Sequence, residues 1–338
     1  MEKPATAPTP ELIFNTFNAY QRTAALKAAV ELDLFTAIGE GATTAKALTE
    51  RCQASERGVR ILCDYLTIHG LLTKEGNRYG LTLDSATFLD RRSPACMAGA
   101  AKFLTSPALM DNFKDLTATV RRGGSGIQPD GSFGDGNAAW VEFARSMVPI
   151  VIGAAGDIVE LLGNPNGARW KVLDIAAGHG MFGITLAKRH PSAEIVAVDW
   201  PEVLTVAREN AEAAGVASRH RTIPGSAFEV EFGDGYDVAL LTNILHHFDA
   251  PTCEGLLRKV HRALKPGGRA ATLEFVPNED RISPPTPAAF SLMMLGGTPA
   301  GDAHTFSELD GMFRRAGFSR NELHQASKSP EQIIISSR

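Results

Sequence analysis

A group of glycines and carboxylates near the middle of the chain is the first set of residues suited to chemistry. Asp174 precedes the turn Ala176-Ala-Gly-His-Gly180, and Asp199 ends the next apolar run. A strand, a glycine turn, a helix and a second strand ending in a carboxylate are typical of a nucleoside-cofactor site. Glycines allow positive φ and a close approach to the ligand, and the carboxylate can accept both ribose hydroxyls. The pattern therefore predicts that a nucleoside binds here.

Two kinds of nucleoside cofactor fit this turn. Gly178, Gly180 and Gly183 spell the G-x-G-x-x-G of dinucleotide sites, where a helix N-terminus meets a pyrophosphate. Asp174, four residues before Gly178, would repel a pyrophosphate but attract an ammonium group. S-adenosylmethionine carries an ammonium group and a sulfonium. The sequence thus favours this methyl donor over a nicotinamide dinucleotide.

Adjacent histidines supply a second chemical feature. His246 and His247 follow the predicted strand 236–243, and Glu274 ends the next predicted strand. Methyl transfer requires an aligned nucleophile and removal of its proton. Histidine suits the base, and Glu274 is placed to hold its tautomer. The alternative is that the histidines cap a helix or pack against the sheet. No metal site is expected, because adjacent histidines point apart and no third ligand has useful spacing.

The elements that position these residues alternate along the C-terminal half. Alternating strands and helices predict a doubly wound, mostly parallel sheet with helices on both faces. Ligands of such sheets lie beyond the carboxyl ends of the strands, where the glycine turn, Asp199, Gly225 and His246 are all expected. The predicted strands span 171–175, 194–199, 219–224, 236–243, 268–275 and 331–336, and the helices 182–189, 201–214, 250–264 and 306–315.

The N-terminal part has the order of a winged helix: helices over 12–35, 44–52 and 55–69, then a hairpin over 71–81. Residues 1–90 carry nine Lys or Arg and eleven Asp or Glu, a net charge of −2, whereas a DNA-reading surface is basic. The first helix is more apolar than a small domain needs, which favours dimerisation over DNA binding.

Between the two parts, residues 91–120 are predicted to be helical, residues 121–137 to form a glycine-rich loop and residues 138–162 to form one or two helices. We therefore expect a winged-helix dimerisation domain over 1–95, a helical linker and substrate-pocket region over 96–165, and a cofactor-binding catalytic domain over 166–338.

Composition narrows the partners and the compartment. The 338 residues have 44% hydrophobic and 21% charged content and a net charge of −4, which gives no reason to expect nucleic acid. No signal pattern opens the chain, and no apolar run approaches the roughly 20 residues that span a bilayer. Four cysteines are scattered without metal or redox spacing. A cytoplasmic protein with no membrane partner is expected.

These motifs together resemble the class I S-adenosylmethionine-dependent O-methyltransferases of the two-domain type. This family includes plant phenylpropanoid, acetylserotonin and bacterial polyketide O-methyltransferases. The family's D-x-G-G-G-x-G corresponds to Asp174–Gly180 with two alanines, its D-L-P to Asp199–Pro201, and its H-D-W to His246–Phe248. Its Pro-Gly-Gly loop matches Pro266–Gly268. The resemblance implies a Rossmann-like catalytic domain, an N-terminal winged-helix dimerisation domain and a homodimer.

The resemblance also assigns roles to single residues. It makes His246 the general base and Glu274 its orienting acid, with His247 in the place of the aspartate. An aromatic small molecule is the implied methyl acceptor, bound by Phe103, Phe143, Met147, His246, His247, Phe290, Met293 and Met294. The implied cofactor residues are Asp174, Ala176, Gly178, Gly180, Asp199, Trp200, Gly225, Ser226, Ala227, Phe228, Thr242, Asn243 and Met147.

Two departures keep other functions open. The family's G-D-M-F reads Gly225–Phe228 with Ser226 in place of the acid, and a second orienting acid falls on Ala303. The base is therefore expected to have at most one carboxylate partner. The alternatives are C-methylation, a degenerate member that uses the cofactor in another way, and a cofactor-sensing winged-helix regulator that binds DNA.

Overall fold

A computed structural model describes residues 8–126, 138–163 and 167–338. The chain separates into two compact units, with the boundary between Thr105 and Ser106. Among the described residues, every helix is too short or too polar to cross a lipid bilayer.

The first unit has the predicted helix–turn–helix and hairpin. Thr44 and Ser55 cap their helices by accepting hydrogen bonds from the backbone N–H of Ala47 and Gly58. The single helix predicted over 12–35 was wrong: it is interrupted at Asn18, and Asp33 has the left-handed φ of 53° that aspartate tolerates. The elements are α1 (Glu11–Phe17), α2 (Ala19–Glu31), α3 (Leu34–Gly39), α4 (Ala45–Cys52), α5 (Glu56–Ile68), β1 (Leu72–Glu75), β2 (Arg78–Leu81), α6 (Leu83–Phe88) and α7 (Ala100–Leu104).

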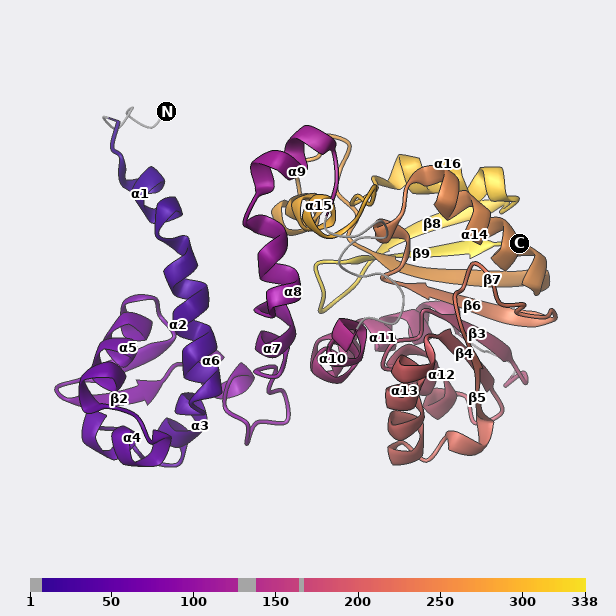
Figure 1. Ribbon diagram of the computed structural model, residues 1–338. Helices are drawn as coiled ribbons and strands as arrows, with labels where there is room; N and C mark the ends of the chain where they lie inside the picture. The colour runs from indigo at the N-terminus through magenta and orange to yellow at the C-terminus, as the bar shows by residue number, and fades with distance from the viewer. Residues whose placement is uncertain (1–7, 127–137, 164–166) are drawn as a thin grey trace, which may run out of the picture. The chain divides into compact units, whose positions relative to one another are not determined.

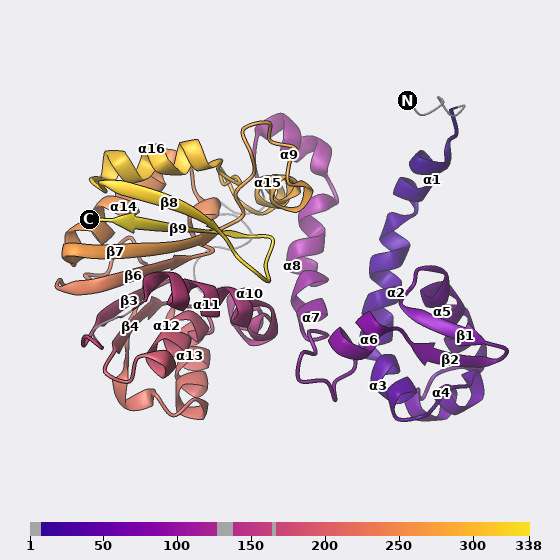
Figure 2. The same ribbon diagram turned by 180° about the vertical axis from the view of Figure 1, so that it is seen from behind.

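The second unit is built on a seven-stranded sheet of order β5-β4-β3-β6-β7-β9-β8 (Figures 1 and 2). Strands β3, β4, β5, β6 and β7 are parallel to one another, and β9 and β8 add an antiparallel edge. This confirms the mostly parallel, doubly wound sheet, although β8 was not predicted. The strands are β3 (Lys171–Ile175), β4 (Glu194–Asp199), β5 (His220–Pro224), β6 (Tyr236–Thr242), β7 (Leu264–Glu274), β8 (Arg320–Gln325) and β9 (Gln332–Ser337).

Helices cover both faces of this sheet. Side chains alternate across each strand, so Val172 and Ile195 pack with α11 and α12 on one face. Leu173 and Val196 pack toward α14 and α16 on the other. These strands are almost wholly apolar, as expected when both faces are buried. The helices are α11 (Val148–Leu162), α12 (Met181–Arg189), α13 (Pro201–Ala213), α14 (Ala250–Ala263) and α16 (Phe306–Ala316).

The helices that are not packed on the sheet include several short ones that were not predicted. In place of one helical stretch over 91–120, short helices follow one another, and Pro107 begins one of them. Residues 138–162, predicted to form one or two helices, form two, whereas α15 was missed because three prolines lie at its start. Most of the predicted glycine-rich loop lies outside the described residues. These helices are α8 (Pro107–Met110), the 3₁₀ turn η1 (Asp111–Phe113), α9 (Leu116–Arg122), α10 (Ala138–Ser146) and α15 (Pro285–Gly297).

Candidate active site

The glycine turn between β3 and α12 bends by means of left-handed residues. Gly178 and Gly180 have φ of 58° and 74°, and Ala176 has φ of 52°. Gly183, in the first turn of α12, is required for a different reason. A Cβ there would lie 2.7 Å from both Asp174 Oδ2 and Ile195 Cγ2, so only glycine lets α12 approach the sheet this closely.

Asp199 stands at the carboxyl end of β4 and closes one side of the turn. Its Oδ2 accepts a hydrogen bond from Gly178 N at 2.7 Å, and its Oδ1 accepts one from Trp200 N at 2.7 Å. Burial raises the pKa of this carboxyl to about 6, against the lowering effect of the two N–H donors. Each oxygen keeps a lone pair, so the carboxylate can still accept ribose hydroxyls.

Asp174 lies beneath the turn and not on a cavity wall. It is fully buried; its Oδ2 accepts from Gly183 N at 3.1 Å, while Oδ1 has no hydrogen-bond partner among the described residues. Burial raises its pKa to about 7, and the nearby Asp199 acts in the same direction. The predicted direct contact with an ammonium group therefore stays a prediction.

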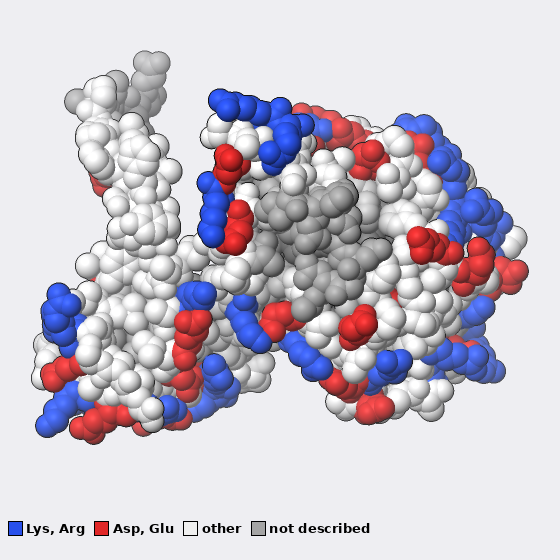
Figure 3. Space-filling view, viewed as in Figure 1, with Lys and Arg blue, Asp and Glu red and all other residues white. Residues whose placement is uncertain are grey.

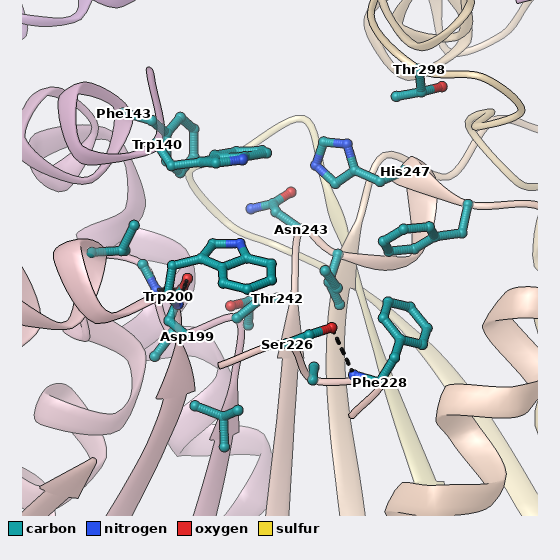
Figure 4. A pocket seen from close by; sticks show the side chains of 18 of the residues that line it. Trp140, Phe143, Asp199, Trp200, Ser226, Phe228, Thr242, Asn243, His247 and Thr298 are labelled. Atoms are coloured by element: carbon teal, nitrogen blue, oxygen red, sulfur yellow. Dashed lines mark hydrogen bonds between the residues drawn. The ribbon is translucent and has the colours of Figure 1, made fainter. Parts of the chain in front are cut away.

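A cavity of about 470 Å³ opens above these strand ends, within the range of small-molecule sites (Figure 4). Trp140 from α10 and His247 meet edge to face over the cavity, with ring centroids 5.4 Å apart. Asp199 and Trp200 lie on another wall. The predicted residues that line the cavity are Phe143, Ala176, Gly178, Asp199, Trp200, Gly225, Ser226, Ala227, Phe228, Thr242, Asn243 and His247.

The structure adds cavity residues that were not among the predicted site residues. Phe248 is one of them. Its ring lies 4.9 Å from that of the predicted residue Phe228, at 80°, which gives one end of the cavity an aromatic lining suited to the flat adenine ring. His179 was visible in the glycine turn but was assigned no role; burial lowers its pKa to about 4. Asp249, Thr252 and Thr298 carry no sequence signal that marks them as cavity residues.

The cavity fits S-adenosylmethionine. Asp199 offers acceptors for a ribose, Phe228 and Phe248 offer an apolar aromatic surface, and the φ of 130° at Gly225 brings the backbone into the wall. Ser226 Oγ accepts from Phe228 N at 3.3 Å, so it holds its own loop (Figure 4). Among the described residues, no group of three His, Cys, Asp or Glu side chains is placed to bind a metal.

Behind the cavity lies a histidine cluster, which we define as His246, His247 and Glu274. His246 is buried, and its Nδ1 lies 2.5 Å from Glu274 Oε2. Glu274 Oε1 accepts from Ile244 N at 3.1 Å and Leu245 N at 2.7 Å. The carboxylate thus orients both the ring of His246 and the turn η3 (Leu245–His247) that carries it.

The two histidines of the cluster face different surroundings. His247 lines the cavity, and burial, assisted by its neighbour His246, holds its pKa well below the ordinary value. It is therefore neutral at physiological pH. His246 is not among the cavity-lining residues; it contacts Phe290, whose ring centroid is 4.9 Å away.

Four of the predicted acceptor residues, Phe103, Phe290, Met293 and Met294, are not among those that line the cavity. Phe290 stacks on Phe275 at 4.0 Å and contacts His246, which places it beside the predicted base. Met294 is buried and its carbonyl accepts from Thr298, whereas Met293 is half-buried on the same helix. Phe103 belongs to the first unit. Gly180, Met147, Glu274, Met293 and Met294 do not line the described cavity.

Comparison with known proteins agrees with this geometry. Residues 167–319 match the O-methyltransferase domain family, and residues 14–91 match the O-methyltransferase dimerisation domain family. A Nostoc punctiforme protein assigned to the O-methyltransferases is 51% identical, with a TM-score of 0.95 over 98% of this chain and 100% of that one.

Two more relatives span nearly the whole chain. The tetracenomycin polyketide synthesis 8-O-methyl transferase of Streptomyces glaucescens is 28% identical over 89% of each protein. Human N-acetylserotonin methyltransferase, solved with S-adenosylmethionine, shares the fold, with a TM-score of 0.85 at 21% identity over 100% of this chain and 99% of that one.

A parallel sheet with a nucleoside cavity beside a histidine–carboxylate pair defines a methyltransferase of the class I fold. The chain belongs to the O-methyltransferase family with an N-terminal dimerisation domain, and its cofactor is S-adenosylmethionine.

Proposed function

We propose that this enzyme methylates a hydroxyl group of an aromatic small molecule, with His246 as the general base. The observation that carries the proposal is the 2.5 Å contact between His246 Nδ1 and Glu274 Oε2. Relatives named for tetracenomycin polyketide synthesis, a hydroxynaphthoate and acetylserotonin support an aromatic acceptor. Phe290 and Phe275, stacked beside the base, add an apolar aromatic surface.

The tautomer of His246 follows from the contacts of Glu274. Two backbone N–H groups donate to Oε1, so the carboxylate acts as an acceptor, and Oε2 accepts a hydrogen bond from Nδ1–H of His246. This leaves the lone pair on Nε2, the nitrogen that removes the proton from the acceptor hydroxyl. When bound, S-adenosylmethionine supplies an activated methyl group on its sulfonium. Glu274 then stabilises the imidazolium that His246 becomes.

Neutral His247 and Trp140 form a wall of the cofactor cavity, and neither side chain transfers a proton in the proposed mechanism. Their edge-to-face contact covers the cavity and limits access of water, which would otherwise compete for the base. Asp199, with the backbone N–H groups of the glycine turn, holds the nucleoside end of the cofactor in place.

The experiment is a methyl-transfer assay with a panel of hydroxynaphthoates, hydroxyquinones and N-acetylserotonin. Product mass reports transfer, and the carbon chemical shift of the new methyl group separates an ether from a C-methyl product. The variant His246→Asn should lose roughly 10²- to 10⁴-fold in turnover. The matched control is His324→Asn on β8, which lies outside the cavity. Wild-type turnover in His246→Asn would show that His246 is not the base. A C-methyl product would show that the enzyme is a C-methyltransferase and not an O-methyltransferase.

We propose further that the enzyme is a homodimer formed through α1 and α2. Leu12, Phe14 and Phe17 are 77%, 59% and 71% exposed, and the surface over α1 is nearly uncharged in Figure 3. Large hydrophobic side chains exposed side by side in this way mark an interface. The paired substitution Phe14→Asp and Phe17→Asp should yield a monomer by light scattering. A dimer that survives this change would refute the assignment.

Charge pairing in the first unit favours dimerisation over DNA binding. Arg51 pairs with Asp33 and Glu40, while Arg60 and Lys74 both pair with Asp64. These three cations are thus neutralised locally, which weakens the attraction of this surface for phosphates. The proposed compartment is the cytoplasm, where the four free cysteines remain thiols.

A further inference from the structure

The loop between β5 and β6 begins with four residues that line the cofactor cavity, and we call residues 225–230 the cavity loop. The loop contains a single helical turn, in which the N–H groups of Glu229 and Val230 donate to Ser226 O at 3.0 and 2.9 Å. One turn has too few hydrogen bonds to be stable by itself, and its last carbonyl groups have no partner within it. The cavity loop therefore needs contacts from other elements to keep its shape.

Lys259 on α14 supplies such contacts. Its Nζ donates to the carbonyl oxygens of Ala227 at 3.0 Å, Phe228 at 3.1 Å and Val230 at 2.5 Å. The same nitrogen lies 4.4 Å from the ring centroid of the buried Phe232, and a cation is attracted to the face of such a ring. Lys259 is not among the residues that line the cavity, so it acts on the cavity through the loop.

The three acceptors around one nitrogen indicate which form of Lys259 is present. An ammonium group has three N–H donors, whereas a neutral amine has two and a lone pair that would face the third carbonyl. Burial lowers the pKa of Lys259, Glu231 raises it, and Arg262 lowers it. Only the charged form satisfies all three carbonyl groups together, and hydrogen bonds from a charged donor are the stronger kind.

The cavity loop also connects the two parts of the cofactor site. Gly225 donates its backbone N–H to Asp199 O at 2.9 Å, so the loop begins beside the residue that offers acceptors to the ribose. Phe228 lies edge to face against Phe248 at the aromatic end of the cavity. The Ser226 side chain, which stands where the family has an acid, accepts one N–H, from Phe228 at 3.3 Å (Figure 4). The shape of the loop therefore depends strongly on Lys259.

We propose that Lys259 is a positioning residue for the cofactor: its ammonium group fixes the cavity loop in the shape that receives the adenine ring of S-adenosylmethionine. The inference rests on the fit of this ring at Phe228 and Phe248. It goes beyond the proposed function, because it holds whichever residue is the base. Without the three hydrogen bonds the unliganded loop loses order, and that order must be restored on binding. Binding is then weaker, while the chemical step in the bound complex is unchanged.

The test compares ligands that contain adenine with one that lacks it. Lys259→Met keeps an unbranched side chain of similar length and removes the three donors. We expect calorimetry to show about tenfold weaker binding of S-adenosylhomocysteine and of methylthioadenosine, which lacks the amino-acid part. S-ribosylhomocysteine has the ribose and the amino acid but no base. Competition calorimetry should give its dissociation constant within about twofold of the wild-type value.

Two further variants serve as controls. Arg258→Met removes the neighbouring cation of α14, which is exposed and pairs with Glu254, and should bind all three ligands like wild type. Lys259→Arg keeps the charge, but a planar guanidinium cannot point three donors in the same directions, so its loss should be about threefold. An equal loss for all three ligands in Lys259→Met indicates a general structural defect and overturns the proposal. Unchanged affinity for methylthioadenosine overturns it as well.

Hydrogen exchange measures the cavity loop itself. In the cofactor-free Lys259→Met protein, amides of residues 226–230 should exchange about tenfold faster than in wild type, and S-adenosylhomocysteine should restore their protection. Unchanged exchange would contradict the proposal. If Lys259→Met folds poorly, Lys259→Gln, which loses the charge and one donor, should weaken methylthioadenosine binding at least about threefold. Wild-type affinity in that variant would count against Lys259.

Turnover adds a third readout, with whichever acceptor is methylated. In Lys259→Met the KM for S-adenosylmethionine should rise about tenfold, while kcat should stay within about twofold of wild type. A fall in kcat with an unchanged KM would contradict a role in cofactor binding. Full turnover in His246→Asn would remove the base assignment but leave the binding results for Lys259 as they are, so the two failures are distinguishable.

Discussion

The cofactor wall, which we define as Ala176–Gly180 with Asp199, and the histidine cluster stand at the same edge of the sheet. In the wall, the side chain of Asp199 is held by two backbone N–H groups from its own neighbourhood. In the cluster, the imidazole of His246 contacts the carboxylate of Glu274, and these two side chains come from η3 and from the end of β7. In the function proposed above, the wall therefore recognises a ligand with fixed dipoles, whereas the cluster takes the proton of the acceptor.

This difference predicts how each region responds to substitution. Fixed N–H donors tolerate a lost side chain with little rearrangement, so damage to the wall should affect binding alone. In the proposed function the cluster takes the proton of the acceptor, so damage to it should affect turnover while binding is preserved.

The largest effect is expected from Glu274→Gln. The amide keeps an oxygen for the N–H groups of Ile244 and Leu245, but its N–H group donates to Nδ1 of His246 and forces the proton onto Nε2. The base then has the wrong tautomer, and turnover should fall about a thousandfold. Steady-state assays measure turnover, and calorimetry should find S-adenosylhomocysteine affinity within threefold of wild type. A turnover loss below tenfold would contradict the mechanism.

Asp199→Ala should produce the next largest effect, on the other side of the comparison. Two charge-assisted hydrogen bonds to a ribose are lost, so affinity for S-adenosylhomocysteine should fall about a hundredfold. Calorimetry measures this loss. Glu202→Gln, in the exposed first turn of α13, is the matched control and should bind normally. If saturating cofactor does not restore turnover in Asp199→Ala, the separation of binding from proton transfer is wrong.

The two regions also differ in how far the sequence predicts them. The wall lies on consecutive elements, so β3 and β4 were predicted with their observed limits and the turn and Asp199 followed. The cluster depends on strand order, and Glu274 was predicted because β7 follows β6 in the chain and lies next to it in the sheet. Asp174 shows another limit, since a strand pattern places a carboxylate near a turn but does not say whether it faces the ligand or the core.

A smaller effect is expected on the pH dependence of stability, where the buried Asp174 should behave differently from the exposed carboxylates. Its pKa, raised by burial to about 7, means that the folded state holds the proton more tightly than the unfolded state. Stability from this group is present at low pH and is lost as pH rises from about 4 to about 7. Between pH 5 and pH 7 the loss should be about 2 kcal/mol. Asp174→Asn should abolish this part of the pH dependence in urea unfolding of the cofactor-free protein, and Asp111→Asn should retain it. Parallel curves for wild type and Asp174→Asn would refute the assignment.

The smallest effect concerns the two alanines that replace family glycines in the wall. Ala176 has φ of 52°, where a Cβ costs about 1 kcal/mol. Ala177 does not have a positive φ, and its methyl group is buried. Ala176→Gly should therefore raise the free energy of unfolding slightly, since relief of strain exceeds the added entropy of the unfolded chain. Ala177→Gly should lower it by about 1 kcal/mol, because it gains only flexibility and loses a packed methyl. Thermal melts of the two variants measure the opposite signs. Equal losses would mean that the surroundings of Ala176 relax its strain.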